Sequence, residues 1–250
     1  MRCGGILGQV SQNIYDDPNF HDAYRRLPRS EHGLEGAPEW PTVARLLPEL
    51  NGRDVADLGC GFGAFARWAA ERGARVDAFD LSQRMLARAG ELTSEGAAIN
   101  YQRADLDQLK VRADAYDVAY SALTLHYLSD LSRLLGVVHR ALRSDGSLVL
   151  TVEHPVYTAP TTIEFQEVDG RRIWPLDRYG EEGARRRDWL APGVRKQHRT
   201  FGTWINSLVD AGFTVRRVID WRPSPEQIAA QPPLAEEVDR PMFLIIAAGR

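Results

Sequence analysis

Cysteine is scarce in this chain of 250 residues, which contains only Cys3 and Cys60. Two cysteines this far apart form neither a disulfide framework nor a zinc cluster, so we expect a reducing compartment and no metal site. An excess of one charge is also missing, because 31 Lys and Arg residues oppose 34 Asp and Glu residues. The formal net charge of −3 shows no excess of positive charge that could bind nucleic-acid phosphates, so we expect no nucleic-acid partner.

Long hydrophobic runs are missing as well. The first residues contain no continuous apolar stretch of signal-peptide length, and no segment approaches the ~20 apolar residues of a membrane span, so no membrane association is expected. The 44% hydrophobic and 26% charged residues are typical of globular proteins and exclude disordered, collagen-like and coiled-coil chains. We therefore expect a cytoplasmic protein with one sizeable core.

From residue 54 onward, short apolar runs alternate with segments of helical spacing. Runs at 55–58, 75–80, 99–103, 116–121 and 148–152 are typical of buried strands, the last one entered through a turn at 144–147. Helical spacing follows the first two runs, with Ser82 as a predicted N-cap, and returns at Leu131 and Phe201. Strands at 213–220 and 242–247 complete the pattern. This order predicts an α/β fold with a parallel sheet, helices on both faces and right-handed crossovers.

Two segments depart from this alternation. Residues 1–50 are polar and proline-rich, and we expect short helices and loops that cover the core of residues 51–152. Residues 153–199 have no clear periodicity but many aromatic side chains, which favours an ordered functional insertion, a lid, over disorder. We interpret its arginine run at 185–187 as a solvated face. Residues 200–250 supply the last helix and the closing strands of what we expect to be a single domain.

A glycine-rich turn joins the first predicted strand to its helix. Gly59, Gly61 and Gly63 allow a sharp turn close to a ligand, at a helix start with free N–H groups. The turn alone also fits a dinucleotide-binding pattern. The surroundings favour a ligand site, because Asp57, Asp80 and Asp105 stand at or just after the carboxyl ends of three successive strands. A lone aspartate at such a position is commonly just an N-cap.

At these residues the chain resembles the class I S-adenosylmethionine-dependent methyltransferases. The resemblance rests on Asp57 with the glycine turn, on Asp80 with residues 82–86, on the segment 104–106, and on residues 116–118 leading to Ser121. Tyr116 stands where the family usually has Phe. The whole chain is similar to uncharacterised bacterial members that share the segments 153–155 and 196–200. The resemblance implies a Rossmann-like sheet of seven mostly parallel strands with the last strand antiparallel.

The resemblance also implies S-adenosylmethionine as cofactor and S-adenosylhomocysteine as product. Asp57 is expected to face the amino group of the cofactor, Asp80 the ribose hydroxyls and Asp105 the adenine amino group. Arg29 is expected to contact the cofactor carboxylate, with Arg25 and Arg26 as competitors. The full set of implied cofactor contacts is Tyr24, Arg29, Asp57, Gly59, Gly61, Gly63, Asp80, Leu81, Met85, Asp105, Leu106 and Ser121.

The methyl acceptor is expected beside the loops that follow the fourth and fifth strands, since open α/β sheets bind ligands at the carboxyl ends of their strands. Methyl transfer from a sulfonium requires alignment and exclusion of water, and a base only if the acceptor must lose a proton. His154 is our candidate base, with His126 and His198 as alternatives; His154 and His198 can instead clamp the lid. The predicted substrate contacts are His126, Tyr127, Tyr157, Tyr179 and His198.

We therefore expect a methyltransferase that acts on a small molecule, at an oxygen atom. Methylation of RNA or protein and a non-catalytic, cofactor-binding subunit remain alternatives. A nicotinamide dehydrogenase of the short-chain type is disfavoured, because no Tyr-x-x-x-Lys pair occurs and the only lysines are Lys110 and Lys196. The sequence does not indicate an oligomeric state.

Overall fold

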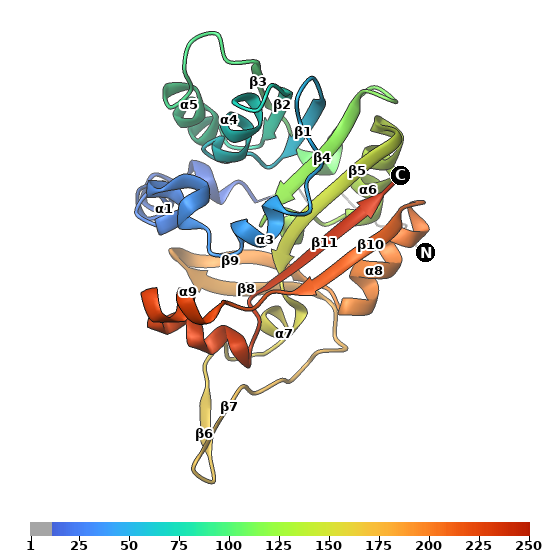
Figure 1. Cartoon of the computed structure of the whole chain (residues 1–250). Helices are drawn as coiled ribbons and strands as arrows, with labels where there is room; N and C mark the ends of the chain where they lie inside the picture. The colour runs from blue at the N-terminus through green and yellow to red at the C-terminus, as the bar shows by residue number, and fades with distance from the viewer. Residues whose placement is uncertain (1–11) are drawn as a thin grey trace, which may run out of the picture.

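A seven-stranded sheet with the order β10-β11-β5-β4-β1-β2-β3 forms the centre of the molecule (Figure 1). The computed structural model describes residues 12–250, so Cys3 and the first part of the predicted N-terminal cover lie outside the described residues. Neighbouring strands from β5 to β3 are parallel, and β11 runs antiparallel to both β5 and β10. The predicted fold class is thus confirmed, with these strands: β1 (Asp54–Leu58), β2 (Arg75–Asp80), β3 (Ile99–Arg103), β4 (Tyr116–Ala122), β5 (Leu142–Glu153), β10 (Thr214–Asp220) and β11 (Phe243–Gly249).

Helices cover both faces of this sheet. On one face, α3 (Trp40–Ala44), α4 (Ala64–Ala70) and α5 (Gln83–Glu91) pack around Val55, Val76 and Val118. On the other face, α6 (Leu131–Ala141) and α8 (Phe201–Asp210) bury their apolar stripes against the sheet. Caps fix where these helices begin, as at Ser82, whose hydroxyl accepts a hydrogen bond from the Met85 amide at 3.1 Å.

The N-terminal segment folds as short helices over the carboxyl edge of the sheet. These are η1 (Ile14–Asp16), α1 (Pro18–Tyr24), α2 (Pro28–Glu31) and η2 (Gly33–Gly36). Asp16 ties the segment to the start of α5, because its carboxylate accepts hydrogen bonds from the Ser82 hydroxyl at 2.6 Å and the Arg84 amide at 3.1 Å. The expected cover is therefore anchored beside the glycine turn.

Strand β5 begins earlier than predicted. The turn expected at residues 144–147 is an irregularity inside one strand, where the pairing with β4 shifts between Tyr116 opposite Leu142 and Val118 opposite Ser147. The polar residues 144–147 resemble a turn in sequence, but the partner strand continues on both sides of them.

Residues 153–199 are more regular than their sequence indicates. After α7 (Pro155–Thr158), two antiparallel hairpins follow, β6 (Gln166–Val168) with β7 (Arg171–Ile173), and β8 (Gly183–Trp189) with β9 (Ala191–His198). The first hairpin projects from the body of the molecule, whereas the second lies across the carboxyl ends of the strands beside α1 (Figure 1). Charged residues on both hairpins hide the strand period. Residues 221–241, which the sequence analysis leaves unassigned, form α9 (Pro225–Ala230) and η5 (Pro232–Val238); η3 (Leu106–Gln108) and η4 (Leu125–Tyr127) complete the elements.

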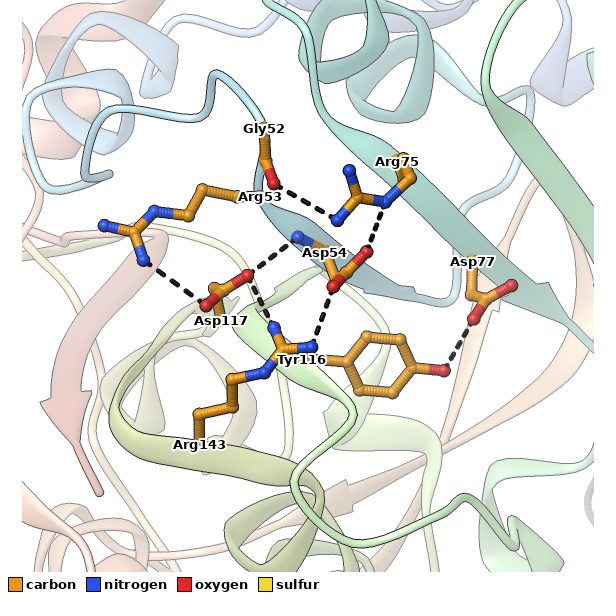
Figure 2. A network of polar contacts seen from close by, with 8 residues as sticks. All are labelled: Gly52, Arg53, Asp54, Arg75, Asp77, Tyr116, Asp117 and Arg143. Atoms are coloured by element: carbon orange, nitrogen blue, oxygen red, sulfur yellow. Dashed lines mark hydrogen bonds and ion pairs between the residues drawn. The ribbon is translucent and has the colours of Figure 1, made fainter.

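An ion-pair network ties four strands together at the amino edge of the sheet (Figure 2). Arg143 of β5 donates to Asp54 of β1 at 2.8 Å and to Asp117 of β4 at 2.6 Å, and Arg75 of β2 donates to Asp54 at 2.7 Å. Burial opposes ionisation of both carboxylates, but hydrogen bonds lower their pKa values. For Asp54 these bonds come chiefly from the Arg75 and Arg143 guanidinium groups, and for Asp117 from the Asp54 amide and then Arg143. The network therefore stabilises the end of the sheet remote from the glycine turn.

Tyr116 also forms a contact at the amino edge of the sheet. Its hydroxyl donates a hydrogen bond to Asp77 of β2 at 2.9 Å (Figure 2). The departure from the family's usual Phe thus adds a polar contact between strands and leaves the carboxyl edge unaffected.

Candidate active site

A cavity of about 330 Å³ lies at the carboxyl ends of β1, β2, β4 and β5. The N-terminal segment and the β8–β9 hairpin close it from above, with the Phe20 and Trp189 rings 5.5 Å apart where the two meet. Twelve of the predicted site residues line this cavity: Tyr24, Arg29, Gly59, Gly61, Asp80, Leu81, Met85, Asp105, Leu106, His126, Tyr127 and Tyr157.

The three glycines of the turn serve different purposes. All have positive φ, at 85° for Gly59, 53° for Gly61 and 71° for Gly63. A Cβ on Gly61 would meet nothing within 4 Å, so this residue faces open space in the cavity. A Cβ on Gly63 would lie 2.2 Å from the Tyr101 hydroxyl, and Gly63 does not line the cavity. Gly61 therefore leaves room for a ligand, whereas Gly63 permits helix α4 to pack.

Asp57 places a buried carboxylate with one unpaired oxygen behind the glycine turn. It is 2% exposed, and its Oδ2 has no hydrogen-bond partner among residues 12–250. Burial, with a smaller contribution from nearby Asp80, raises its pKa well above the usual value. Asp57 borders a second, smaller cavity of about 100 Å³ that also touches Gly59, Gly61 and Arg29. An orphaned buried acceptor of this kind fits the ammonium group of the expected cofactor.

Asp80 connects the turn to the next helix. Its carboxylate accepts hydrogen bonds from the Gly61 amide and the Ser82 amide, each at 2.9 Å. Burial nevertheless raises its pKa. Each carboxylate oxygen can accept a further bond from the cavity side, which is what a ribose diol requires.

Asp105 both caps a helix and lines the cavity. Its carboxylate caps η3 by accepting from the Asp107 amide at 3.0 Å, and the same residue lines the cavity. The cap orients the side chain beside Leu106 and Leu81, where the adenine ring is expected.

Arg29 and Tyr24 bring the N-terminal segment to the cavity. Arg29 Nη2 lies 3.0 Å from Glu39 Oε1, which holds the guanidinium between the two cavities. Sequence reasoning missed Tyr15, whose ring packs edge-on against Tyr24 at 5.3 Å and whose hydroxyl lies 3.1 Å from that of Tyr127. No motif marks Tyr15, because only the fold brings residues 15 and 127 together.

Ser121 lies just behind the cavity wall. It is fully buried and its hydroxyl donates to the Leu58 carbonyl at 2.7 Å, linking β4 to β1. The next residue, Ala122, lines the cavity. The side chain of Ser121 therefore supports the wall from outside it.

His126 faces the cavity as a neutral ring. It is 2% exposed, and burial lowers its pKa to about 4. Its Nδ1 accepts a hydrogen bond from the Glu153 amide at 3.4 Å, which assigns the proton of the neutral ring to Nε2. At neutral pH His126 is thus a hydrogen-bond donor toward the cavity, and its one lone pair is taken by the backbone.

Glu153 and Lys196 form a buried ion pair beside His126. The Lys196 ammonium contacts the Glu153 carboxylate and lies 4.6 Å from the Trp189 ring centre. Although burial opposes ionisation, the positive surroundings lower the pKa of Glu153. Both side chains line the cavity, and neither was among the predicted site residues.

Besides Asp57, Gly63 and Ser121, three residues predicted for the acceptor side do not line the cavity either. His154 caps α7 by accepting from the Val156 amide at 3.1 Å, and its Nε2 lies 2.8 Å from Asp220. His198 is fully buried, with Nδ1 2.7 Å from the Thr158 hydroxyl and Nε2 2.9 Å from the Tyr179 carbonyl. The Tyr179 hydroxyl accepts from the Phe201 amide at 3.0 Å. The structure therefore places His154, Tyr179 and His198 as supports of the insertion, as in the clamp alternative.

The prediction of a solvated arginine face at 185–187 is wrong for two of the three residues. Arg185 is 5% exposed and Arg187 half-buried, and both line the cavity, whereas Arg186 is exposed. Successive side chains of a strand point to opposite sides, and β8 turns one side toward the cavity.

Within residues 12–250 no helix combines the length and hydrophobicity needed to cross a membrane. The same part of the chain contains no group of three or more His, Cys, Asp or Glu side chains arranged to hold a metal ion.

Comparison with known proteins identifies the family. Residues 56–150 match the model of a methyltransferase domain. The crystal structure of an S-adenosylmethionine-dependent methyltransferase from Mesorhizobium loti is 50% identical, with a TM-score of 0.83, over 87% of this chain and 100% of that one. An uncharacterised protein of Haemophilus influenzae is 31% identical over 89% of this chain and 94% of its own length.

A malonyl-(acyl-carrier protein) O-methyltransferase of Pectobacterium atrosepticum is 33% identical over 50% of this chain and 48% of its own length. This match spans about half of either protein, so it concerns the shared core. The cavity at the strand ends, the unpaired oxygen of Asp57 and the match over most of the chain lead to one conclusion: the protein belongs to the S-adenosylmethionine-dependent methyltransferases and is an enzyme that uses this cofactor.

Proposed function

We propose that the enzyme transfers the methyl group to an oxygen atom of a small organic molecule. The observation that carries this proposal is the shape of the cavity, which continues from the glycine turn past His126 and Tyr127 to the β8–β9 hairpin. Its 330 Å³ suits a small ligand, and aromatic side chains bound it. The O-methyltransferase named above, similar over half of the chain, supports oxygen as the acceptor atom.

In this proposal the cofactor half of the cavity is held by the strand ends. Asp57 binds the ammonium group, Asp80 the ribose hydroxyls, and Leu81, Met85 and Leu106 surround the adenine. The cofactor supplies an activated methyl group. The protein aligns the acceptor with it and keeps water away, which is the main need of a direct displacement.

The N-terminal segment and the hairpin exclude water. Tyr15, Tyr127 and Trp189 form an aromatic wall over the acceptor, and the hydrogen bond between the two tyrosine hydroxyls links cover to core. His154 has no part in the reaction in this proposal, because Val156 and Asp220 engage its ring nitrogens.

The test is a thermal-shift screen of small metabolites in the presence of S-adenosylhomocysteine, followed by turnover with carbon-13-labelled methyl donor. The carbon-13 chemical shift of the product distinguishes methyl groups on oxygen, nitrogen and carbon. A labelled methyl on nitrogen or carbon would refute the proposal, as would exclusive labelling of RNA or protein. Asp80→Ala, expected to weaken S-adenosylhomocysteine binding at least about tenfold, is the control for cofactor-dependent turnover.

A further inference from the structure

Arg185 and Arg187 bring positive charge without an ion-pair partner to the cavity wall. Arg185 is 5% exposed, and within residues 12–250 neither guanidinium has a carboxylate within ion-pair distance. Their hydrogen bonds go to neutral main-chain carbonyls, from Arg185 to Glu181 and from Arg187 to Thr158 at 3.2 Å and to Pro160. Arg185 Nε is buried without a partner in the described part of the chain. Burial lowers the pKa of both guanidinium groups, and a buried cation without a counter-ion is costly.

No carboxylate of the described residues forms an ion pair with either guanidinium, although Glu153 attracts Arg187, and Glu181 and Asp177 attract Arg185, from a greater distance. Glu153 is in contact with Lys196, which stands directly opposite Arg185 in the β8–β9 register. Asp188 also lines the cavity, but it is exposed and accepts a hydrogen bond from the Gly193 amide at 2.9 Å. Cations therefore outnumber carboxylates at this wall, which favours an anionic ligand.

The same part of the cavity contains no side chain suited to remove a proton from the acceptor. His126 is neutral with its lone pair engaged, and the pairing with Lys196 helps to lower the pKa of Glu153, which makes this carboxylate a weak base. Burial raises the pKa of the Tyr127 and Tyr157 phenols. An acceptor that is already deprotonated at neutral pH needs no base. A carboxylate, with a pKa of about 4, meets this condition and an alcohol does not.

We propose that the acceptor is the carboxylate of an organic acid, that Arg187 and Arg185 bind it, and that the product is its methyl ester. This proposal rests on the proposed function and names its substrate class. One carboxylate oxygen forms the bond to the methyl carbon as the bond from that carbon to the sulfonium sulfur breaks, with its electron pair left on sulfur. No proton moves, and the neutral ester no longer pairs with the arginines, which favours its release.

The aromatic wall indicates the rest of the acid. Trp189 and Tyr127 lie beside the cations, with Lys196 Nζ 4.6 Å and 5.8 Å from their ring centres. Met242 and Phe243 line the same cavity. An acid with an apolar body and one free carboxylate fits this combination.

The test measures binding to the enzyme saturated with S-adenosylhomocysteine. The probes are benzoate, phenylacetate and hexanoate, their amides and methyl esters, and phenyl phosphate. Titration calorimetry compares the wild-type protein with Arg187→Gln and Arg185→Gln. Arg186→Gln is the matched control, because Arg186 lies on the same strand with the opposite orientation and is exposed.

We expect at least one acid to bind about tenfold more tightly than its amide and ester. Arg187→Gln should remove that preference, and Arg186→Gln should leave it unchanged. S-adenosylhomocysteine binding by each variant verifies that the variant is folded. If Arg185→Gln does not fold, the acid preference of Arg187→Gln alone tests the proposal. The turnover of the preferred acid should be independent of pH from about 6 to 8, since no base titrates there.

Several outcomes would overturn the inference. They are equal binding of acids and amides, no acid-specific binding in the whole panel, tighter binding of phenyl phosphate than of any acid, or an equal loss in Arg186→Gln. A turnover that rises as the pH increases through about 7 would also overturn the inference, because it would reveal a general base. Methylation of a neutral hydroxyl would refute this inference and leave the proposed function intact, whereas methylation at nitrogen or carbon would refute both.

Discussion

Asp57 shows how one residue can lower stability and favour ligand binding at once. Its carboxylate is buried at the end of β1 with Oδ2 unpaired in the described structure, and its pKa is raised by burial. Such a group binds a proton more tightly in the folded state than in the unfolded state. The stability of the ligand-free protein should therefore fall as the pH rises above the unfolded value of about 4.

The substitution Asp57→Asn separates these two effects. Because Asn cannot ionise, we expect the ligand-free variant to be more stable than the wild type near pH 8, with the difference shrinking toward about pH 4. Binding of S-adenosylhomocysteine should weaken about tenfold, since a charged hydrogen bond to the ammonium is replaced by a neutral one. Thermal unfolding with and without the ligand measures both changes. A variant that loses stability and retains full affinity would contradict this view of Asp57.

At the scale of elements, the β8–β9 hairpin is held over the cavity by contacts to distant parts of the chain. Lys196 of β9 pairs with Glu153 at the end of β5, and both side chains are largely buried. Arg199, just after β9, donates to the Leu128 carbonyl. These contacts fix the hairpin on the core, so that the side of β8 carrying Arg185 and Arg187 faces the cavity.

Removing the Lys196 ammonium should leave Glu153 buried and unpaired. We expect Lys196→Met to lower the free energy of unfolding by about 3 kcal/mol near neutral pH. The pKa of Glu153 would then rise above its unfolded value, so the loss should be smaller near pH 4 and grow as the pH rises. Urea denaturation at several pH values measures the effect.

The double variant Glu153→Gln with Lys196→Met is the control for this pair. It should regain most of the lost stability, because no uncompensated charge remains buried. Equal losses in the single and double variants would mean that Lys196 acts through packing rather than through its charge.

On the scale of the whole molecule, the two edges of the sheet have different tasks. The carboxyl edge bears the cavity and its unpaired charges, whereas the amino edge bears the paired network of Asp54, Asp117 and Arg143 (Figure 2). Stability and ligand binding can therefore be changed independently. The lowered pKa values of Asp54 and Asp117 contribute stability above about pH 4, which is lost as the pH falls through their folded values.

Arg143→Met should reveal this contribution. We expect it to lower the free energy of unfolding by about 1 kcal/mol at neutral pH, with a smaller difference near pH 2, where the carboxylates are protonated. Arg88→Met, which removes an exposed pair within helix α5, should cost only about 0.3 kcal/mol. S-adenosylhomocysteine affinity should be unchanged in both variants. A pH-independent loss in Arg143→Met would argue against an electrostatic role.

Local sequence was sufficient to predict the fold and much of the cofactor side. Strand and helix periods and the caps are short-range properties, and parallel strands necessarily bring the residues after their carboxyl ends to one edge. Gly59, Gly61, Asp80 and Asp105 therefore line the cavity together, as their positions after β1, β2 and β3 predict. The assignment of their individual roles remains a prediction.

The acceptor side was decided by contacts between residues far apart in sequence. His154 looked as suitable a base as His126, but Asp220, 66 residues later, lies against its ring. Likewise Arg185, Arg186 and Arg187 are equivalent in sequence, and only the docking of the hairpin through Lys196 and Glu153 determines which two face the cavity. The sequence by itself thus determined the α/β core and its cofactor turn, because these follow from local periodicity. The tertiary structure decided the charge and proton chemistry of the acceptor pocket, because burial and long-range pairing set them.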